Sequence, residues 1–319
     1  AAAPKKVWLR SALAEAWGFL WRWNAEPFLC RAREKPRCDA AFLWGVMVSL
    51  CVALRYDRSH MTTTIFAQPF DPVGCAACKD KSLLPFAFTM AFQPIMDMET
   101  GRPFAYEALV RGVNGESAAS VLSWVDDGNR YRFDQACRVK AIELASRLGL
   151  AALPDCRLSI NFLPNAVYRA ETCIRATLEA AREFSFPHGR IMFEVTENEP
   201  LNHGEHLKAI FNEYRRQGLI TAIDDFGAGY AGLNMLTRFQ PHVLKIDMEL
   251  IRNIDQDPVR QAIAGGIELV CKRLGIVIIA EGIETEAESQ YLQSLGIRYQ
   301  QGYLFARPGW ESLPLEGGM

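Results

Sequence analysis

Two neighbouring carboxylates directly follow an apolar run that is typical of a β-strand. Asp224 and Asp225 come after residues 219–223, and Gly227 and Gly229 follow in the sequence I-D-D-F-G-A-G-Y. Two adjacent negative charges repel each other, and this repulsion is tolerable only in water or beside cations. A lone Asp-Asp-x-Gly is more simply explained as a solvated turn, in which Asp and Gly serve the backbone geometry. The choice between a turn and a cation site therefore depends on the rest of the chain.

Other predicted strands also carry polar side chains in their carboxyl-terminal parts. A buried parallel strand is normally almost wholly apolar, because helices cover one face of the sheet and the core fills the other. A single buried polar group is usually structural, whereas the same pattern on seven strands predicts a shared site. In a barrel these strand ends converge on one mouth. The side chains concerned are Glu107, Asn161, Glu194, Asp224 with Asp225, Lys245, Glu281 and Gln301.

These side chains are rich in oxygen and favour a hard divalent cation. Carboxylates and amide oxygens suit Mg²⁺ or Mn²⁺ better than zinc, and none of the five histidines belongs to the set. Two cations ~3.5–4 Å apart need bridging ligands, which would explain why Asp224 and Asp225 stand side by side. Lys245, between Leu244 and Ile246, would place its ammonium in this acidic mouth. The alternative for Lys245 is an ordinary lysine on an edge strand.

Strand-like runs alternate with amphipathic helical segments from about residue 85 onward. Apolar residues at three- and four-residue spacing predict helices between the strands, and the alternation predicts a parallel α/β fold, with a (β/α)₈ TIM-like barrel as the first choice. The predicted strands are 87–95, 104–111, 157–163, 190–197, 219–226, 242–247, 276–282 and 299–305. The predicted helices are 133–148, 174–184, 206–217, 258–274 and 286–295.

Charge is distributed unevenly along the chain of 319 residues, whose net charge is −2. Residues 1–60 contain ten Lys or Arg and five Asp or Glu, which leaves 25 basic and 32 acidic residues for the remainder. This balance argues against a nucleic-acid polymer as the partner, because such binders normally have a basic excess. If the acidic part of the chain after residue 60 binds an anionic substrate, it would need metal ions or a local cluster of basic residues to do so.

The first sixty residues are basic and rich in tryptophan, and they contain a fifteen-residue apolar run at 40–54. This run is short for a membrane span, which needs about 20 residues, although the preceding basic residues would suit the cytoplasmic flank of an anchor. Met61 could instead be the natural start, which would make 1–60 a leader or non-native upstream sequence. We rank this slightly above an anchor and well above an export signal. Membrane contact is expected only if 40–54 is a genuine anchor.

We therefore expect four segments. They are a leader at 1–60, a linker or extension at 61–84, a barrel at 85–312 and a tail at 313–319.

Nine scattered cysteines indicate a reducing compartment such as the cytoplasm and not a disulfide scaffold. Cys137, Cys173 and Cys271 occupy helix-like patterns, which predicts buried free thiols. Cys75 and Cys78 form a C-x-x-C pair, which is half of a zinc site. Because no second pair follows, two incidental thiols are a better explanation than a zinc or redox role.

Eight short motifs occur together in the second part of the chain. They are F-Q-P-I (92–95), E-A-L-V-R (107–111), S-I-N-F (159–162), F-E-V-T-E (193–197), I-D-D-F-G-A-G-Y (223–230), L-K-I-D (244–247), A-E-G-I-E (280–284) and Q-G-Y-L-F-A-R-P (301–308). In order and spacing they resemble the EAL-domain cyclic-di-GMP phosphodiesterase family over roughly residues 86–308. The tripeptide E-A-L alone would be uninformative, but the joint pattern is very specific.

The resemblance implies an EAL-type barrel with two Mg²⁺ or Mn²⁺ ions that hydrolyses cyclic di-GMP to linear pGpG and so lowers this bacterial second messenger. It implies a homodimer formed through the EAL domain. By the family's pattern, Lys245 would orient or activate the attacking water, together with Glu281 and Asp225, and Glu197 would hold the loop that contains Gly227 and Gly229. The implied metal ligands are Glu107, Asn161, Glu194, Asp224, Asp225, Glu281 and Gln301. The implied substrate contacts are Gln93, Leu109, Arg111, Asp247, Glu284, Gln301 and Pro308.

Two other functions remain open from the sequence. The first is a catalytically weak or silent cyclic-di-GMP receptor, a class that usually lacks the metal ligands or the glycine-rich loop, both of which are present here. The second is an unrelated barrel hydrolase, such as a glycosidase that uses two of the carboxylates. Such a glycosidase would need neither metal nor Lys245.

Overall fold

The computed structural model describes residues 84–167, 169–197, 204–229 and 232–315. The predicted leader 1–60, with its apolar run 40–54, lies outside the described residues, as do residues 61–83 with the Cys75 and Cys78 pair and the end of the predicted tail. In the described part, no helix combines the length and the apolar character that crossing a membrane requires.

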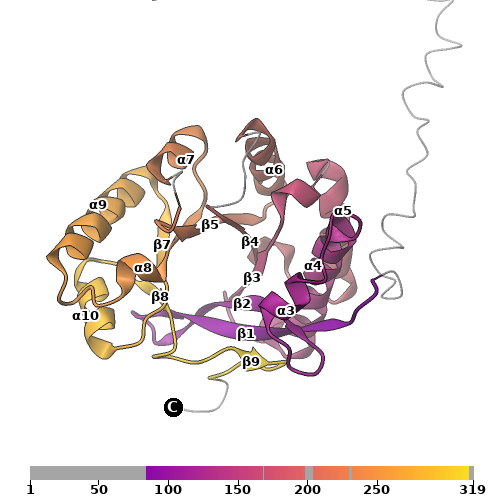
Figure 1. Cartoon of the computed structure of the whole chain (residues 1–319), viewed down its shortest axis with the longest axis horizontal. Helices are drawn as coiled ribbons and strands as arrows, with labels where there is room; N and C mark the ends of the chain where they lie inside the picture. The colour runs from indigo at the N-terminus through magenta and orange to yellow at the C-terminus, as the bar shows by residue number, and fades with distance from the viewer. Residues whose placement is uncertain (1–83, 168, 198–203, 230–231, 316–319) are drawn as a thin grey trace, which may run out of the picture. The chain divides into compact units, whose positions relative to one another are not determined.

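Eight strands close into a barrel, with helices around its outside (Figure 1). Strand order runs from β2 through β8 to β1, and β1 also pairs with β2, which closes the ring. All eight predicted strands are present. Their bounds are β1 Phe88–Asp97, β2 Arg102–Gly112, β3 Arg157–Asn161, β4 Ile191–Thr196, β5 Ile220–Phe226, β6 Val243–Ile246, β7 Val277–Ala280 and β8 Tyr299–Gln301. The prediction of a TIM-like barrel is confirmed.

The five predicted helices are also present, as α4 to α6, α9 and α10. Three shorter helices were not predicted, because fewer than about two turns leave too little periodicity to recognise. The bounds are α3 Ala118–Leu122, α4 Arg130–Arg147, α5 Ala170–Glu183, α6 Gly204–Arg216, α7 Gly232–Arg238, α8 Met248–Ile251, α9 Pro258–Leu274 and α10 Glu286–Ser294. Single 3₁₀ turns lie at η2 Leu150–Ala152, η3 Pro164–Ala166 and η4 His188–Arg190.

Strand β1 runs antiparallel to both of its barrel neighbours, β2 and β8. The expectation of a wholly parallel barrel is wrong for this strand. Residues 98–101 join β1 to β2, and a parallel pair would need a crossover of about a dozen residues or more. A ninth strand, β9 (Gly309–Trp310), pairs with β1 at Ala91 and Phe92, and it lies beside β1 in Figure 1.

An apolar layer inside the barrel supports the predicted site. Side chains along a strand alternate between its two faces, so residues two positions apart share a face. Ala105, Met192, Ala222 and Val243 each stand two residues before a polar site residue on the same strand, and Ile279 of β7 stands two residues before Glu281, which directly follows that strand. Together with Ile95 they form a buried cluster inside the barrel. The polar layer at the mouth therefore rests on an apolar floor.

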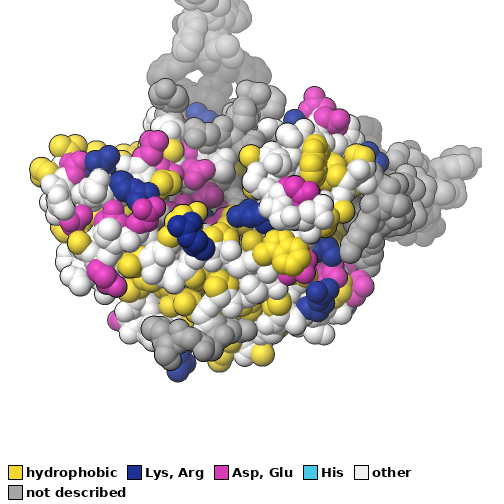
Figure 2. Space-filling view, turned by 60° about the horizontal axis from the view of Figure 1, so that its bottom comes forward, with side chains coloured by type: hydrophobic (Ala, Val, Ile, Leu, Met, Phe, Trp, Pro, Cys, Tyr) yellow, Lys and Arg dark blue, Asp and Glu magenta, His cyan; other side chains and the backbone are white. Residues whose placement is uncertain are grey.

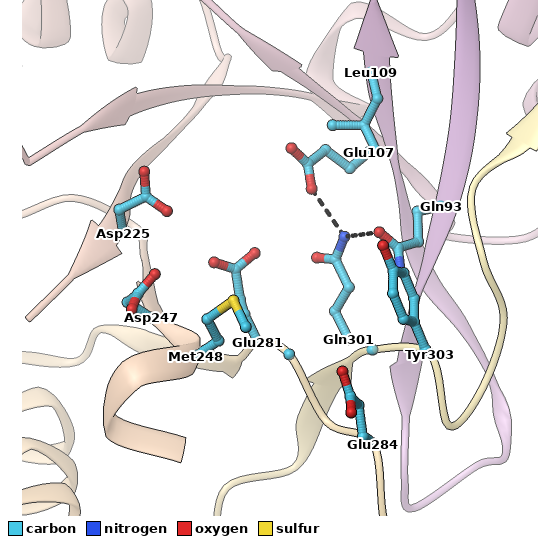
Figure 3. A pocket seen from close by; sticks show the side chains of 12 residues that line it. Gln93, Glu107, Leu109, Asp225, Asp247, Met248, Glu281, Glu284, Gln301 and Tyr303 are labelled. Atoms are coloured by element: carbon cyan, nitrogen blue, oxygen red, sulfur yellow. Dashed lines mark hydrogen bonds between the residues drawn. The ribbon is translucent and has the colours of Figure 1, made fainter. Parts of the chain in front are cut away.

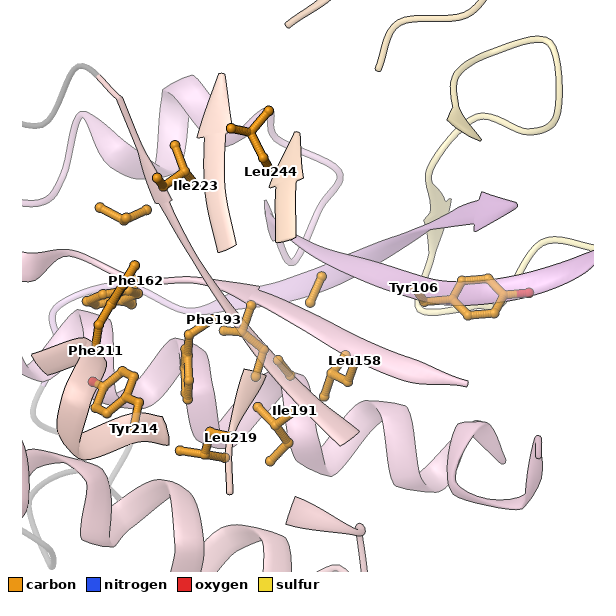
Figure 4. Packing of buried hydrophobic residues seen from close by; sticks show 14 of the residues in the cluster. Tyr106, Leu158, Phe162, Ile191, Phe193, Phe211, Tyr214, Leu219, Ile223 and Leu244 are labelled. Atoms are coloured by element: carbon orange, nitrogen blue, oxygen red, sulfur yellow. The ribbon is translucent and has the colours of Figure 1, made fainter. Parts of the chain in front are cut away.

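A second and larger core fills the space between the barrel and its helices. It includes Leu158, Phe162, Phe193 and Tyr214, which Figure 4 shows packed with neighbouring side chains. Each fully buried aliphatic or aromatic side chain contributes roughly 1.5–3 kcal/mol to folding. These two cores hold the strand ends in fixed positions.

We expect Leu158→Ala to lower the free energy of unfolding by about 2–5 kcal/mol, because it leaves a cavity where no solvent reaches. Leu269→Ala is the matched control, since Leu269 is 51% exposed on α9, and it should change stability by less than about 0.5 kcal/mol. Urea denaturation of the two variants measures the difference. Equal effects would contradict this description of the core.

Candidate active site

The predicted site residues at the carboxyl ends of the strands lie together at one mouth of the barrel. Asn161, the last residue of β3, lies opposite Glu194 of β4 in the strand register. Glu107 of β2 lies opposite Gln93 of the antiparallel β1. Glu281 follows β7 directly, and its amide donates to the Ile246 carbonyl at the end of β6. The carboxyl ends of parallel strands meet at the same edge, which brings these side chains together.

Lys245 lies at the centre of the acidic side chains and is 0% exposed. Its Nζ is 2.7 Å from Glu281 Oε1, 3.0 Å from Asp224 Oδ1, 3.1 Å from Glu194 Oε2 and 3.3 Å from Glu107 Oε2. Burial by itself lowers the pKa of this ammonium, but the surrounding carboxylates raise the pKa well above its usual value. Lys245 is therefore a charged donor at neutral pH.

The four carboxylates around Lys245 carry more negative charge than its single ammonium can neutralise. Burial raises the pKa of Glu194 to about 8, and the neighbouring Glu107 and Asp224 add to the shift. Burial also raises the pKa of Glu281 well above its usual value. For Asp225, burial and then the adjacent Asp224 raise the pKa to about 6. This unfavourable negative charge would be relieved by divalent cations.

A backbone irregularity places Asp224 and Asp225 on the same side. In a regular strand, neighbouring side chains point to opposite faces. Here the register between β5 and β6 shifts between Ile223 and Phe226, and Asp225 has a left-handed backbone with φ +54°. Such an irregularity re-aims a side chain and is frequent beside active sites. As a result, carboxylate oxygens of Asp224, Asp225 and Glu281 lie within 4.8 Å of one another.

Three amide side chains extend the network from Glu107 across the mouth. Asn161 Nδ2 donates to Glu107 Oε1 at 2.9 Å, and Gln301 Nε2 donates to Glu107 Oε2 at 2.8 Å. Gln301 Nε2 also donates to Gln93 Oε1 at 3.3 Å, and Gln93 Nε2 donates to the Ala306 carbonyl at 3.1 Å. Figure 3 shows Gln301 between Glu107 and Gln93. The buried Gln301 Oε1 accepts no hydrogen bond from the described residues, so it is available to a ligand.

The donors fit two divalent cations. One group of mutually close carboxylates contains Glu107, Glu194 and Asp224, and a second contains Asp224, Asp225 and Glu281. Asp224 belongs to both groups, as expected of a carboxylate that bridges two cations. All the donors are oxygen atoms, which suits Mg²⁺ or Mn²⁺.

A cavity of about 240 Å³ opens beside these groups (Figure 3). Eight predicted site residues line it: Gln93, Glu107, Leu109, Asp225, Asp247, Glu281, Glu284 and Gln301. Figure 2 shows acidic side chains gathered beside a hollow on this face. Lys245, Glu194 and Asp224 are buried and do not line the cavity, so the cavity lies beside the buried part of this acidic cluster.

Four further lining residues were not predicted, namely Met248, Gly282, Gly302 and Tyr303. Gly282, Gly302 and Tyr303 stand within the motifs at 280–284 and 301–308, and Met248 directly follows L-K-I-D, so position in or beside the motifs could have identified all four. Gly282 has φ +70°, and a Cβ there would lie 2.3 Å from Met248 Cβ. Only glycine allows the segment after β7 to approach the first residue of α8 this closely.

Asp247 and Glu284 are held at the rim by neighbouring groups. Asp247 caps α8, with Oδ1 accepting from the Glu249 amide at 2.7 Å. Glu284 pairs with Arg252 through two contacts of 2.5 and 3.0 Å. These contacts fix both carboxylates beside the cavity.

Glu197 is buried and binds the glycine-rich loop through both carboxylate oxygens. It accepts hydrogen bonds from the Gly227 amide at 2.8 Å and from the Gly232 amide. Gly227 has φ +104°, and a Cβ there would lie 2.3 Å from Leu250 Cδ1. The loop conformation therefore depends on Glu197 and on glycine at 227. Gly229 lies in the same loop, and its predicted role remains a prediction.

Arg111 and Pro308 are not among the residues that line the cavity. Arg111 Nη1 donates to the Val110 carbonyl at 2.7 Å. Pro308 follows Ala306, the carbonyl partner of Gln93, by two residues. Their predicted contacts with substrate remain predictions.

A family model, the EAL domain, matches residues 83–308. The chain belongs to the EAL domain family. Among solved structures, a standalone EAL protein of Vibrio cholerae O395 in a c-di-GMP-bound form is 55% identical, with a TM-score of 0.70 over 72% of this chain and 96% of that one. BlrP1 of Klebsiella pneumoniae, solved with manganese and cyclic diGMP, is 36% identical, with a TM-score of 0.66 over 70% of this chain and 56% of that one.

The curated relatives of this EAL protein include proteins named for different activities. The blue light- and temperature-regulated antirepressor BluF of Escherichia coli K12 is 34% identical over 224 residues, which are 70% of this chain and 55% of BluF. The cyclic di-GMP phosphodiesterase PdeR of the same organism is 33% identical over 138 residues, which are 43% of this chain and 21% of PdeR. The chain thus spans about half the length of BluF and a fifth of PdeR.

The raised carboxyl pKa values predict that cation binding depends on pH. A carboxylate must lose its proton before it binds a metal, and Glu194 and Asp225 have pKa values raised to about 8 and about 6. We expect the affinity for Mn²⁺ to rise between pH 6 and pH 8, with protons released on binding. Calorimetry in two buffers of different ionisation enthalpy measures both effects. An affinity that is constant or falls over this range would contradict the assignment.

Proposed function

We propose that this EAL protein hydrolyses one phosphodiester bond of cyclic di-GMP, gives linear pGpG and so lowers this bacterial second messenger. The observation that carries the proposal is the pair of carboxylate groups that share Asp224 and surround Lys245, beside a cavity open to substrate. The similarity to PdeR and to EAL structures that contain c-di-GMP supports the choice of substrate.

Two Mg²⁺ or Mn²⁺ ions would occupy the two carboxylate groups. Glu107, Glu194 and Asp224 would hold one ion together with the Asn161 amide oxygen. Asp225 and Glu281 would hold the other with Asp224, and the free oxygen Gln301 Oε1 would complete the shell, partly through water. When bound, the ions would neutralise the phosphate, activate water and stabilise the attacking and leaving oxygens of an in-line displacement.

Lys245 would orient the attacking water and stabilise developing negative charge. Because its pKa is held well above the usual value, Nζ keeps its protons at neutral pH and donates hydrogen bonds. In the reaction, the water oxygen bonds to phosphorus as the bond from phosphorus to the 3′ oxygen breaks. Asp225, which lines the cavity, would accept the proton that water loses on the carboxylate oxygen that does not hold the ion. The 3′ oxygen would leave as a hydroxyl group with a proton from solvent water, and the proton on Asp225 would return to solvent.

The rim of the cavity would recognise the nucleotide. The carboxylate of Glu284 can accept hydrogen bonds from the N1–H and amino groups on one edge of guanine, as can Asp247. Tyr303 offers an aromatic face for stacking, and Leu109 offers apolar contact. Gln93 and Pro308 would border the base, and Arg111 would turn from the Val110 carbonyl to pair with a phosphate.

The alternative is a receptor that binds cyclic di-GMP without cleaving it. The similarity to BluF, which is named as an antirepressor, favours this alternative. Against it, every side chain expected to bind the cations is present, and the mouth brings the carboxylates together. We therefore favour catalysis.

We also propose that the barrel acts in the cytoplasm, either untethered or joined to the inner membrane through 40–54, and that it forms a homodimer. The buried free thiols of Cys137, Cys173 and Cys271 agree with a reducing compartment. Cell fractionation and light scattering test these two proposals. Periplasmic recovery, or a monomer at all concentrations, would refute them.

Incubation of the purified protein with cyclic di-GMP and Mg²⁺ or Mn²⁺ should yield pGpG, and EDTA should abolish the product. Lys245→Met should lower kcat by about 10²–10³, as expected when a charge-stabilising donor is removed, and Glu107→Gln should act similarly. Lys272→Met on α9 is the matched control, because this side chain is largely exposed, and it should behave as wild type.

Chromatographic separation of cyclic di-GMP from pGpG distinguishes the phosphodiesterase from the receptor and from a metal-independent hydrolase. Tight binding of cyclic di-GMP without product, with either metal, would refute the enzyme and favour the receptor. Turnover that resists EDTA and survives Lys245→Met would instead favour a metal-independent hydrolase.

A further inference from the structure

A buried ion pair lies outside the barrel, in the layer between α4 and the strands. Arg138 and Asp134, both on α4, are 0% and 3% exposed, and Arg138 Nη2 is 2.8 Å from Asp134 Oδ2. Removing two charges from water is costly, and their attraction often does not recover this cost. Stability alone therefore gives a weak reason for the pair, and its other contacts indicate a second role.

Asp134 holds the turn that follows β3. Its Oδ1 accepts a hydrogen bond from the Leu163 amide at 2.9 Å, two residues after the expected metal ligand Asn161. Between them, the Phe162 amide donates to the Glu194 carbonyl at 3.0 Å. The carboxylate of Asp134 is thus connected, through the backbone of residues 161–163, to the end of β3 and to Glu194 within β4.

Arg138 packs against the backs of the same two strands. Its guanidinium carbon lies 4.9 Å from the centre of the Phe193 ring and 5.4 Å from that of Phe162. Nη1 donates to the Tyr214 hydroxyl of α6 at 2.8 Å. Figure 4 shows Phe162, Phe193 and Tyr214 together, and their ring centres are 5.0–5.8 Å apart.

The alternation of side chains joins this cluster to the metal site. Phe162 directly follows Asn161, and Phe193 directly precedes Glu194. Within β4, neighbouring residues face opposite sides, so the Phe193 ring points toward the helices and Glu194 points into the mouth. Phe162 follows the last residue of β3, and its ring packs in the same outer core. Any shift of the rings would therefore move Asn161 and Glu194.

We propose that Asp134 and Arg138 are positioning residues, which hold Asn161 and Glu194 in the geometry that the cations require. This inference rests on the proposed metal-dependent function. Mg²⁺ demands a nearly ideal octahedral arrangement, so small displacements of two ligands weaken binding. Neither Asp134 nor Arg138 touches the cations or the substrate; both act through the backbone and the aromatic rings.

The test is the affinity for Mn²⁺ without substrate, measured from the electron paramagnetic resonance signal of free Mn²⁺. Asp134→Asn keeps the shape but removes the charge, and Arg138→Lys keeps the charge but loses the planar group that stacks on the rings. We expect each variant to bind Mn²⁺ about tenfold more weakly, the lower end of the effect of groups that support metal ligands. At saturating Mn²⁺, kcat should return close to the wild-type value.

The control is Arg298→Lys. Arg298 also pairs with a carboxylate, Asp97, through contacts of 2.5 and 2.6 Å, but at the end of the barrel opposite the mouth. We expect this variant to lose stability in thermal unfolding and to keep the wild-type affinity for Mn²⁺. Tyr214→Phe removes only the hydroxyl that accepts from Arg138, and we expect it to fold and to bind Mn²⁺ measurably more weakly than wild type.

The outcomes separate this inference from the proposed function. Wild-type affinity in the folded Asp134 or Arg138 variants would overturn the positioning role, as would an equal loss in the Arg298 control. If Arg138→Lys fails to fold, wild-type affinity in Tyr214→Phe and Asp134→Asn overturns it instead. Failure of the wild-type protein itself to bind Mn²⁺ would refute the proposed metal site.

Discussion

The balance of charge around the buried ammonium of Lys245 governs the mouth of the barrel. Four carboxylates lie within 3.3 Å of Nζ, and one ammonium cannot neutralise them. Burial and mutual repulsion raise the pKa values of Glu194, Glu281 and Asp225, so the fold maintains an arrangement that opposes ionisation. Divalent cations are the partners that such an arrangement binds best. The same charges that strain the site would thus give it affinity for metal.

Rigid surroundings keep the strained residues in place. The apolar layer two residues below the polar one blocks inward collapse of the strand ends. The left-handed backbone at Asp225 turns a second carboxylate into the mouth, and Glu197 holds the loop that follows. Strained conformations persist only when the surrounding structure determines them. The buried pair of Asp134 and Arg138 would extend this support to the outside of the barrel.

Much of the fold and of the site could be predicted from the sequence, because apolar strand-like runs alternate with helical segments and carry polar residues in their carboxyl-terminal parts. The direction of β1 could not be read from its pattern, since alternation is the same in both directions; only the short connection at 98–101 indicates a hairpin. Nothing in the sequence I-D-D-F (223–226) indicates that Asp225 adopts a left-handed backbone conformation. Asp134 and Arg138 were missed for a different reason. Opposite charges four residues apart are typical of a solvated helix face, and only the packing of the helices shows that this pair is buried.

The most direct test of the account is a crystal structure with Mn²⁺, in which anomalous scattering locates the ions. We expect two peaks at the mouth, one beside Glu107, Glu194 and Asn161 and the other beside Asp225 and Glu281, with Asp224 between them. A map with no peak at these carboxylates, or with manganese bound only elsewhere, would contradict it.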